Sequence, residues 1–89
     1  MIENTFKTAV LHHSKGNFSK AKEIYEKLLK TNPNNLATLQ NYASLLSQIK
    51  EYKKAEDIFK KSLKINPKDS MLLYNYGKLF HDQKIFEKA

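Results

Sequence analysis

The chain has 89 residues and no cysteine, which excludes a disulfide framework, a thiol nucleophile and a cysteine-based zinc site. Its apolar runs fall far short of the roughly 18 residues that a membrane-spanning helix needs, and its first residues lack a signal-peptide pattern. The net charge of +7 arises from 16 lysines without any arginine, so we attribute it mainly to composition rather than to a nucleic-acid partner. We expect a cytoplasmic, mostly helical protein without a membrane partner, and we do not favour nucleic acid as its partner.

The chain repeats itself with a period of 34 residues. Pro33 and Pro67 are separated by this period, and each follows an asparagine. Aligning the second period with the first gives ten identical positions. We therefore treat residues 1–89 as one domain that contains repeat 1 (2–35), repeat 2 (36–69) and a partial repeat 3 (70–89).

Apolar residues within each unit have the spacing of an amphipathic helix. The first half of repeat 2 carries them at i, i+3, i+4 and i+7, and repeat 3 has the same stripe. The two stripes consist of Leu39, Tyr42, Ala43 and Leu46, and of Leu73, Tyr76, Gly77 and Phe80. Short polar segments at 14–19, 48–53 and 82–87 predict turns between paired helices. Each Asn-Pro pair ends a second helix, because the residue before proline is disfavoured in the α conformation.

The period and the small and aromatic residues at fixed positions resemble the tetratricopeptide repeat. The small residues are Ala21, Ala55 and Ala89, the aromatic pair is Tyr25 and Phe59, and the prolines occupy the family's proline position. This resemblance implies an all-α, right-handed stack of α-hairpins, an α-solenoid that binds proteins and performs no catalysis. Repeat 1 departs most from the pattern, at Thr5, Thr8 and His12, as an N-terminal capping repeat does.

The resemblance also implies a concave groove lined by the first helix of each repeat. Its candidate binding residues are Phe6, Lys7, Gln40, Asn41, Ser44, Gln48, Tyr74, Asn75 and Lys78. The same face would include Glu3, Val10, His13, Ser14, Ala37, Ser47, Met71, His81 and Asp82. Asn41 and Asn75 share one repeat position, where related proteins hold the backbone of an extended peptide; the alternative is that both are merely solvated. Lys7 interrupts this series in repeat 1.

Other kinds of site find little support in the sequence. The family's clamp for chaperone tails is matched at one position in five, Asn41, so we reject that ligand. His12 and His13 point about 100° apart on a helix, and His81 lies two units away, so we expect no metal site. Motifs for catalysis or phosphate binding are missing, and we expect neither an active site nor a cofactor. The acids of the second helices are spaced i, i+4 from lysines, as on a solvated face.

The sequence stops just after the point where the second helix of repeat 3 would begin. An apolar face at Tyr76 and Phe80 would then be left open. We favour a fragment of a longer array; the alternatives are homo-oligomerisation through this face, or a final cap formed by the last helix.

The leading function is a scaffold that binds a peptide or partner segment, and the alternative is a substrate-recruiting or oligomerising segment of a larger, for example glycosyltransferase-like, enzyme. A third, less favoured function is electrostatic binding of nucleic acid.

Overall fold

The computed structural model describes the backbone of residues 5–88 and the side chains of residues 5–84. Two residues named above, Glu3 and Ala89, lie outside the described residues. The described part consists of α1 (Phe6–Ser14), α2 (Phe18–Thr31), α3 (Leu36–Gln48), α4 (Tyr52–Ile65) and α5 (Ser70–Lys88), without a β-strand. The prediction of an all-α helical repeat is confirmed.

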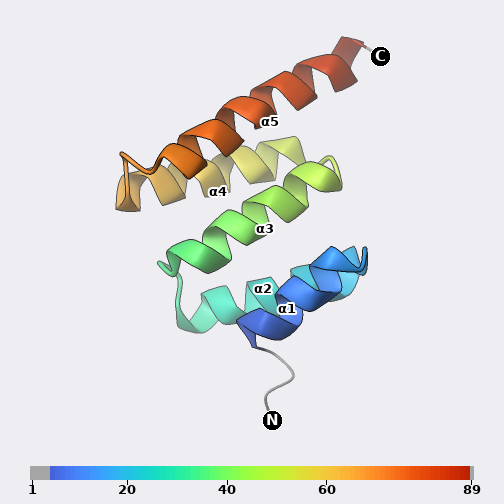
Figure 1. Cartoon of the computed structure of the whole chain (residues 1–89), viewed down its shortest axis with the longest axis vertical. Helices are drawn as coiled ribbons and strands as arrows, with labels where there is room; N and C mark the ends of the chain where they lie inside the picture. Colours follow the sequence, from blue (N-terminus) through green and yellow to red (C-terminus); the bar gives the residue numbers. More distant parts are fainter. Residues whose placement is uncertain (1–4, 89) are drawn as a thin grey trace.

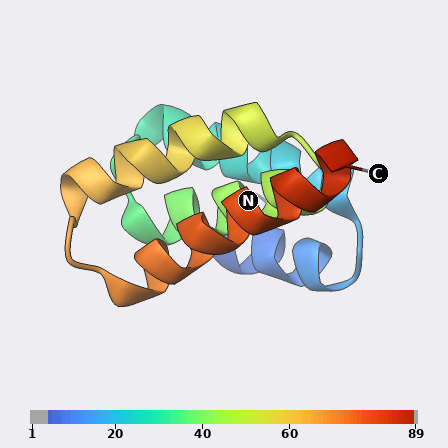
Figure 2. The ribbon, with the colours of Figure 1, turned by 90° about the horizontal axis from the view of Figure 1, so that it is seen from above.

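The helices form hairpins that stack along the long axis of the molecule. α1 packs with α2 and α3 packs with α4, and Figure 1 shows these pairs as successive layers with α5 at the far end. Figure 2, which looks along the stack, places α2 and α4 on one side and α1 and α5 on the other. α3 lies at the centre of the stack, where it contacts all four other helices.

The first two predicted turns are confirmed, and they share one geometry. Gly16 and Lys50, which are 34 residues apart, both adopt a left-handed backbone conformation, with φ of 81° and 66°. The next residue in each turn donates its N–H to a carbonyl five residues back, at 2.8 Å in both cases. These bonds satisfy carbonyls that the end of a helix leaves unpaired. Each hairpin is therefore closed by the same local structure.

The third predicted turn, at 82–87, is wrong. α5 continues through this segment as one unbroken helix to Lys88 (Figure 1). Lys84 occupies the repeat position of Gly16 and Lys50, and a left-handed conformation there costs a non-glycine residue about 1–2 kcal/mol. In repeat 2 the packing of α4 against α3 offsets this cost. Among the described residues no second helix packs back on α5, so nothing offsets this cost at Lys84 and the helix continues.

The core lies where small residues let neighbouring helices approach. Ala9, Ala21, Ala43 and Ala55 are completely buried, and large side chains fill the space around them. These side chains include Tyr25, Ile24, Leu46 and Phe59. In α5 the buried side chains are instead Leu72 and Leu79. This helix therefore keeps its inner contacts while part of its apolar stripe lies open. Of the two residues that the sequence predicted to be open, Phe80 is exposed, whereas Tyr76 is partly buried against the core.

Candidate functional site

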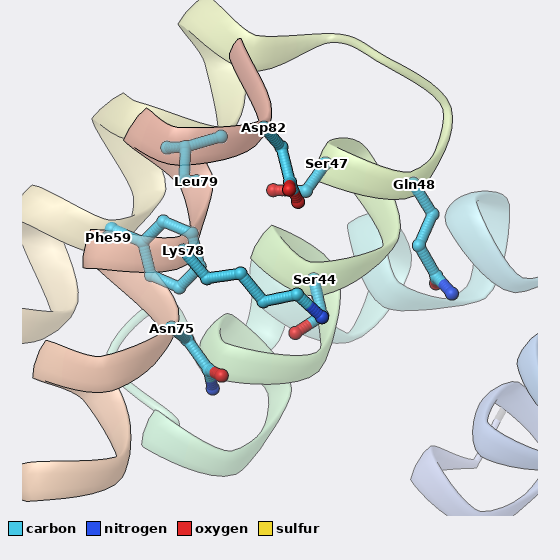
Figure 3. Close-up of a pocket in the computed structure, with 8 residues that line it drawn as sticks. All are labelled: Ser44, Ser47, Gln48, Phe59, Asn75, Lys78, Leu79 and Asp82. Atoms are coloured by element: carbon cyan, nitrogen blue, oxygen red, sulfur yellow. The ribbon is translucent and has the colours of Figure 1, made fainter. Parts of the chain in front are cut away.

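A polar pocket lies between α3 and α5, with a volume of about 200 Å³ (Figure 3). Its floor is apolar, because the buried side chains of Phe59 and Leu79 close it from beneath. Polar side chains from the two facing helices form its walls: Ser44, Ser47 and Gln48 from α3, and Asn75, Lys78 and Asp82 from α5. The pocket thus combines an apolar base with hydrogen-bonding groups at its rim.

Helical spacing aligns these groups on facing sides of the pocket. Ser44 and Gln48 are one turn apart on α3, and the three polar residues of α5 follow i, i+3 and i+7. Figure 3 shows the ammonium group of Lys78 extended toward the hydroxyl of Ser44, and the carboxylate of Asp82 beside Ser47. The rim therefore offers a cation, an anion, hydroxyl groups and an amide, which together can pair with both donors and acceptors of a ligand.

Four of the nine predicted binding residues line this pocket. Ser44, Asn75 and Lys78 surround its centre, whereas Gln48 lies at its edge with its amide turned away from the other three (Figure 3). The floor residues Phe59 and Leu79 were not predicted, because apolar side chains in the repeat pattern were assigned entirely to the core. The sequence shows the repeat positions of these two residues. It does not show that α3 and α5, the first helices of repeats 2 and 3, leave a space above Phe59.

Asn41 and Gln40 are engaged elsewhere. The Nδ2 of Asn41 donates to the carbonyl of Ala37, one turn earlier on the same helix, at 3.0 Å. The Nε2 of Gln40 donates to Asp69 at 3.1 Å, while the other carboxylate oxygen of Asp69 accepts the N–H of Leu72 at the start of α5. Gln40 thereby connects repeat 2 to the first turn of α5. The other N–H of this amide and its oxygen make no hydrogen bond within the described part of the chain, so Asn41 can still contact a ligand.

The remaining three predicted residues are spread over other surfaces. Phe6 is half-buried and its ring lies 6.4 Å from that of Tyr25, so it packs on the core of repeat 1. Lys7 borders a separate, shallow hollow on α1 beside Leu11. Tyr74 is 69% exposed and does not line the pocket between α3 and α5. These three residues therefore lie outside the pocket between α3 and α5.

His13 links the first two repeats rather than facing an open surface. Its Nδ1 lies 3.1 Å from the hydroxyl of Tyr25, and its Nε2 is hydrogen-bonded to the Oε1 of Gln48. A neutral imidazole that accepts at Nδ1 and donates at Nε2 satisfies both bonds. Burial raises the pKa of Tyr25 to about 12, so its phenol remains protonated and can donate to the imidazole. Gln48 is consequently tied toward α1.

Ion pairs on the outer helices are partly within a helix and partly between repeats. Two of the predicted i, i+4 pairs are confirmed, at Nζ–Oε2 distances of 3.6 Å for Lys27–Glu23 and 3.5 Å for Lys60–Glu56. Glu26 contacts Lys54 of the next repeat instead, at 3.5 Å, and Lys22 similarly reaches Glu51 at 3.0 Å. These acids contribute to stacking as well as to the solvated face.

Two further features of the described residues bear on function. Among residues 5–84, no three of histidine, aspartate and glutamate come together in a way that could hold a metal ion. No helix in the described part of the chain is long and apolar enough to cross a membrane.

A family model described as tetratricopeptide repeat matches residues 12–89. The match covers the end of α1 and all of the following helices, including both walls of the pocket. A comparison with curated protein sequences returned no match.

Proposed function

Because the chain belongs to the tetratricopeptide repeat family, we propose that it is a non-catalytic scaffold that binds an extended peptide or partner segment beside α3 and α5. Repeats of this family generally mediate protein–protein interaction. The proposed binding unit comprises repeat 1 (2–35), repeat 2 (36–69) and the partial repeat 3 (70–89). Recruitment of a substrate to a catalytic domain elsewhere in a longer protein would use the same surface.

The observation that carries this proposal is the pocket between α3 and α5. Its buried apolar floor can take a ligand side chain, and its rim can pair with the backbone on either side of that side chain. Asn75 makes no hydrogen bond within the described part of the chain, so its amide can donate to a peptide carbonyl and accept from a peptide N–H. Lys78 adds a charge that favours acidic ligands. These groups make Asn75 and Lys78 the centre of the proposed site.

The experiment that tests this proposal selects ligands first and locates them afterwards. A phage library of random peptides is selected against the immobilised chain, and the enriched peptides are synthesised and measured by fluorescence anisotropy. The double variant Asn75→Ala with Lys78→Ala should weaken binding by a factor of ten or more, since two polar contacts of about 1 kcal/mol each are removed. A matched control, Asn34→Ala with Lys61→Ala, changes the same residue types away from the pocket and should leave affinity unchanged. Equal affinity for both double variants would contradict the proposal.

A second candidate function is self-association, the oligomerising alternative raised by the sequence. One observation favours it, namely the exposure of Leu73 and Phe80 on the outer side of α5. This side does not line the pocket, so the two functions are compatible.

A further inference from the structure

The apolar stripe of α5 forms an exposed surface that we call the open face. It consists of Leu73, Tyr76, Gly77 and Phe80. The matching residues of α3, which pack beneath α4, are at most 3% exposed: Leu39, Tyr42, Ala43 and Leu46. In α5, by contrast, Leu73 is 50% exposed and Phe80 is 49% exposed, while Tyr76 between them is partly buried. The open face is therefore a helix-packing surface whose partner helix is missing from the described structure.

Contacts with α4 hold the aromatic part of the open face in place. The ring of Tyr76 stacks on the buried ring of Phe59, with centroids 5.7 Å apart, and the ring of Phe80 lies 4.9 Å from that of Tyr76. The hydroxyl of Tyr76 donates to Glu56 at 3.4 Å. A partner would meet rings that are already positioned, which lowers the entropy lost on association.

The open face is complementary to itself when two copies of α5 run antiparallel. A two-fold axis between residues 76 and 77 places Leu73 opposite Phe80 and Tyr76 opposite Gly77 of the other copy. Each contact then pairs a larger side chain with a smaller one. A Cβ added at Gly77 would meet nothing within 4 Å, so the second copy's ring has open space there. Ala43, at the same repeat position, is completely buried where α4 packs against α3.

Charges at the two ends of the open face match in the same register. Lys84 lies four residues beyond Phe80, and Asp69 lies four residues before Leu73. The two-fold axis therefore brings each exposed Lys84 toward the partly buried Asp69 of the other copy, whose carboxylate also accepts from Gln40 and from the N–H of Leu72. This opposite-charge contact occurs twice. A parallel arrangement would instead place like charges together. Charge complementarity thus selects the antiparallel orientation.

On the basis of the self-association given above as the second candidate function, we propose that the chain forms a two-fold symmetric homodimer in which α5 packs antiparallel on α5 of a second copy. The second α5 takes the place on the open face that α4 takes on the stripe of α3. Such an interface is isologous, which means that both copies use the same surface and every contact occurs twice. Because one helix of each copy forms it, we expect it to bury less than the roughly 800 Å² per partner of a standard interface, and we expect micromolar rather than nanomolar association. Both pockets between α3 and α5 stay accessible.

Sedimentation equilibrium of the full 89-residue chain tests the dimer directly. The mass should rise from 10.4 kDa toward twice that value as concentration increases from about 1 µM to about 1 mM. Gly77→Leu should abolish this rise, because it fills the space that the facing Tyr76 needs. The variant itself should fold, since leucine favours a helix more than glycine does. Tyr74→Glu, also on α5 but away from the open face, should leave the dimer intact.

The absence of cysteine makes the register testable as well. One chain carrying Leu73→Cys is mixed with another carrying Phe80→Cys and oxidised under mild conditions. The mixed disulfide should exceed either symmetric one, because residue 73 faces residue 80 only in the antiparallel pair. Symmetric disulfides in excess would overturn the proposed register. The mass measurement has two outcomes that would overturn the proposal. A monomer at every concentration would assign the open face to another occupant, such as a further helix or a different protein. A larger assembly would exclude the two-fold dimer.

Discussion

Removal of one hydroxyl group should measure how strongly repeat 1 is joined to repeat 2. The hydroxyl of Tyr42 on α3 donates to Oε2 of Glu26 on α2 at 2.6 Å, and the same oxygen lies 3.5 Å from Nζ of Lys54 on α4. Glu26 therefore connects three helices. Tyr42→Phe keeps the ring and deletes only this hydrogen bond.

The expected cost follows from the surroundings of the two groups. A hydrogen bond to a charged partner contributes about 1.5–3 kcal/mol to the free energy of unfolding. The Glu26 side chain is 41% exposed, so water can replace the lost donor, and we expect a loss near the lower limit, about 1.5 kcal/mol. In a domain of this size that loss should lower Tm by roughly 6–12 °C. Lys54→Gln removes only a half-exposed ion pair and a contact with the Tyr42 ring at 6.0 Å, and should cost less than about 1 kcal/mol.

Urea unfolding followed by circular dichroism gives both values, with Tyr74→Phe as the matched control. That variant deletes the same hydroxyl from a ring that is 69% exposed, and its stability should stay within about 0.5 kcal/mol of the parent. The reasoning is refuted if Tyr42→Phe is as stable as Tyr74→Phe, or if Lys54→Gln costs more than Tyr42→Phe.

Two other predictions concern alkaline pH and the hairpin turns. Burial raises the pKa of Tyr25 to about 12 from an ordinary value near 10, so its contribution to stability should be complete below pH 10 and be lost as the pH rises to about 12. Urea midpoints should fall over this interval, and Tyr25→Phe should flatten the decline; a parallel decline in the variant would contradict the assignment. Gly16→Ala should lower stability by about 1 kcal/mol and Lys50→Gly should raise it slightly, because both positions have positive φ. Thermal unfolding of the two variants tests this, and a change of the same sign in both would be inconsistent with the shared geometry.

The period of 34 residues predicted the helical repeat fold and two of the three turns correctly. Gly16 and Lys50 close their hairpins at matching positions, and Pro33 and Pro67 follow the helices that they were expected to end. Lys84 shows the limit of the pattern. A repeat position prescribes a turn only where a second helix can pack against the first, and this depends on tertiary contacts rather than on the residue itself.

The candidate site was less predictable, because helical spacing places a residue on a face without specifying its bonds. Ser44, Asn75 and Lys78 do line one pocket, as their shared face suggested. Gln40 occupies the same kind of position, yet it is hydrogen-bonded to Asp69, a partner 29 residues away in the sequence. Such a contact depends on the offset between neighbouring repeats. Contacts between repeats therefore engage some side chains that the pattern of a single helix predicts to be available to a ligand.

The central position of α3 has a consequence for the order in which the stack comes apart. Among the described residues, α3 contacts every other helix, whereas α5 contacts α3 and α4 alone. Loss of a terminal helix leaves α3 with partners, so unfolding should begin at the ends of the stack and reach α3 last. The pocket has one wall on the best-anchored helix and the other on a terminal helix. A ligand that contacts both walls would therefore hold α5 against α3 and slow the local unfolding of α5, even if the ligand makes no contact with the core.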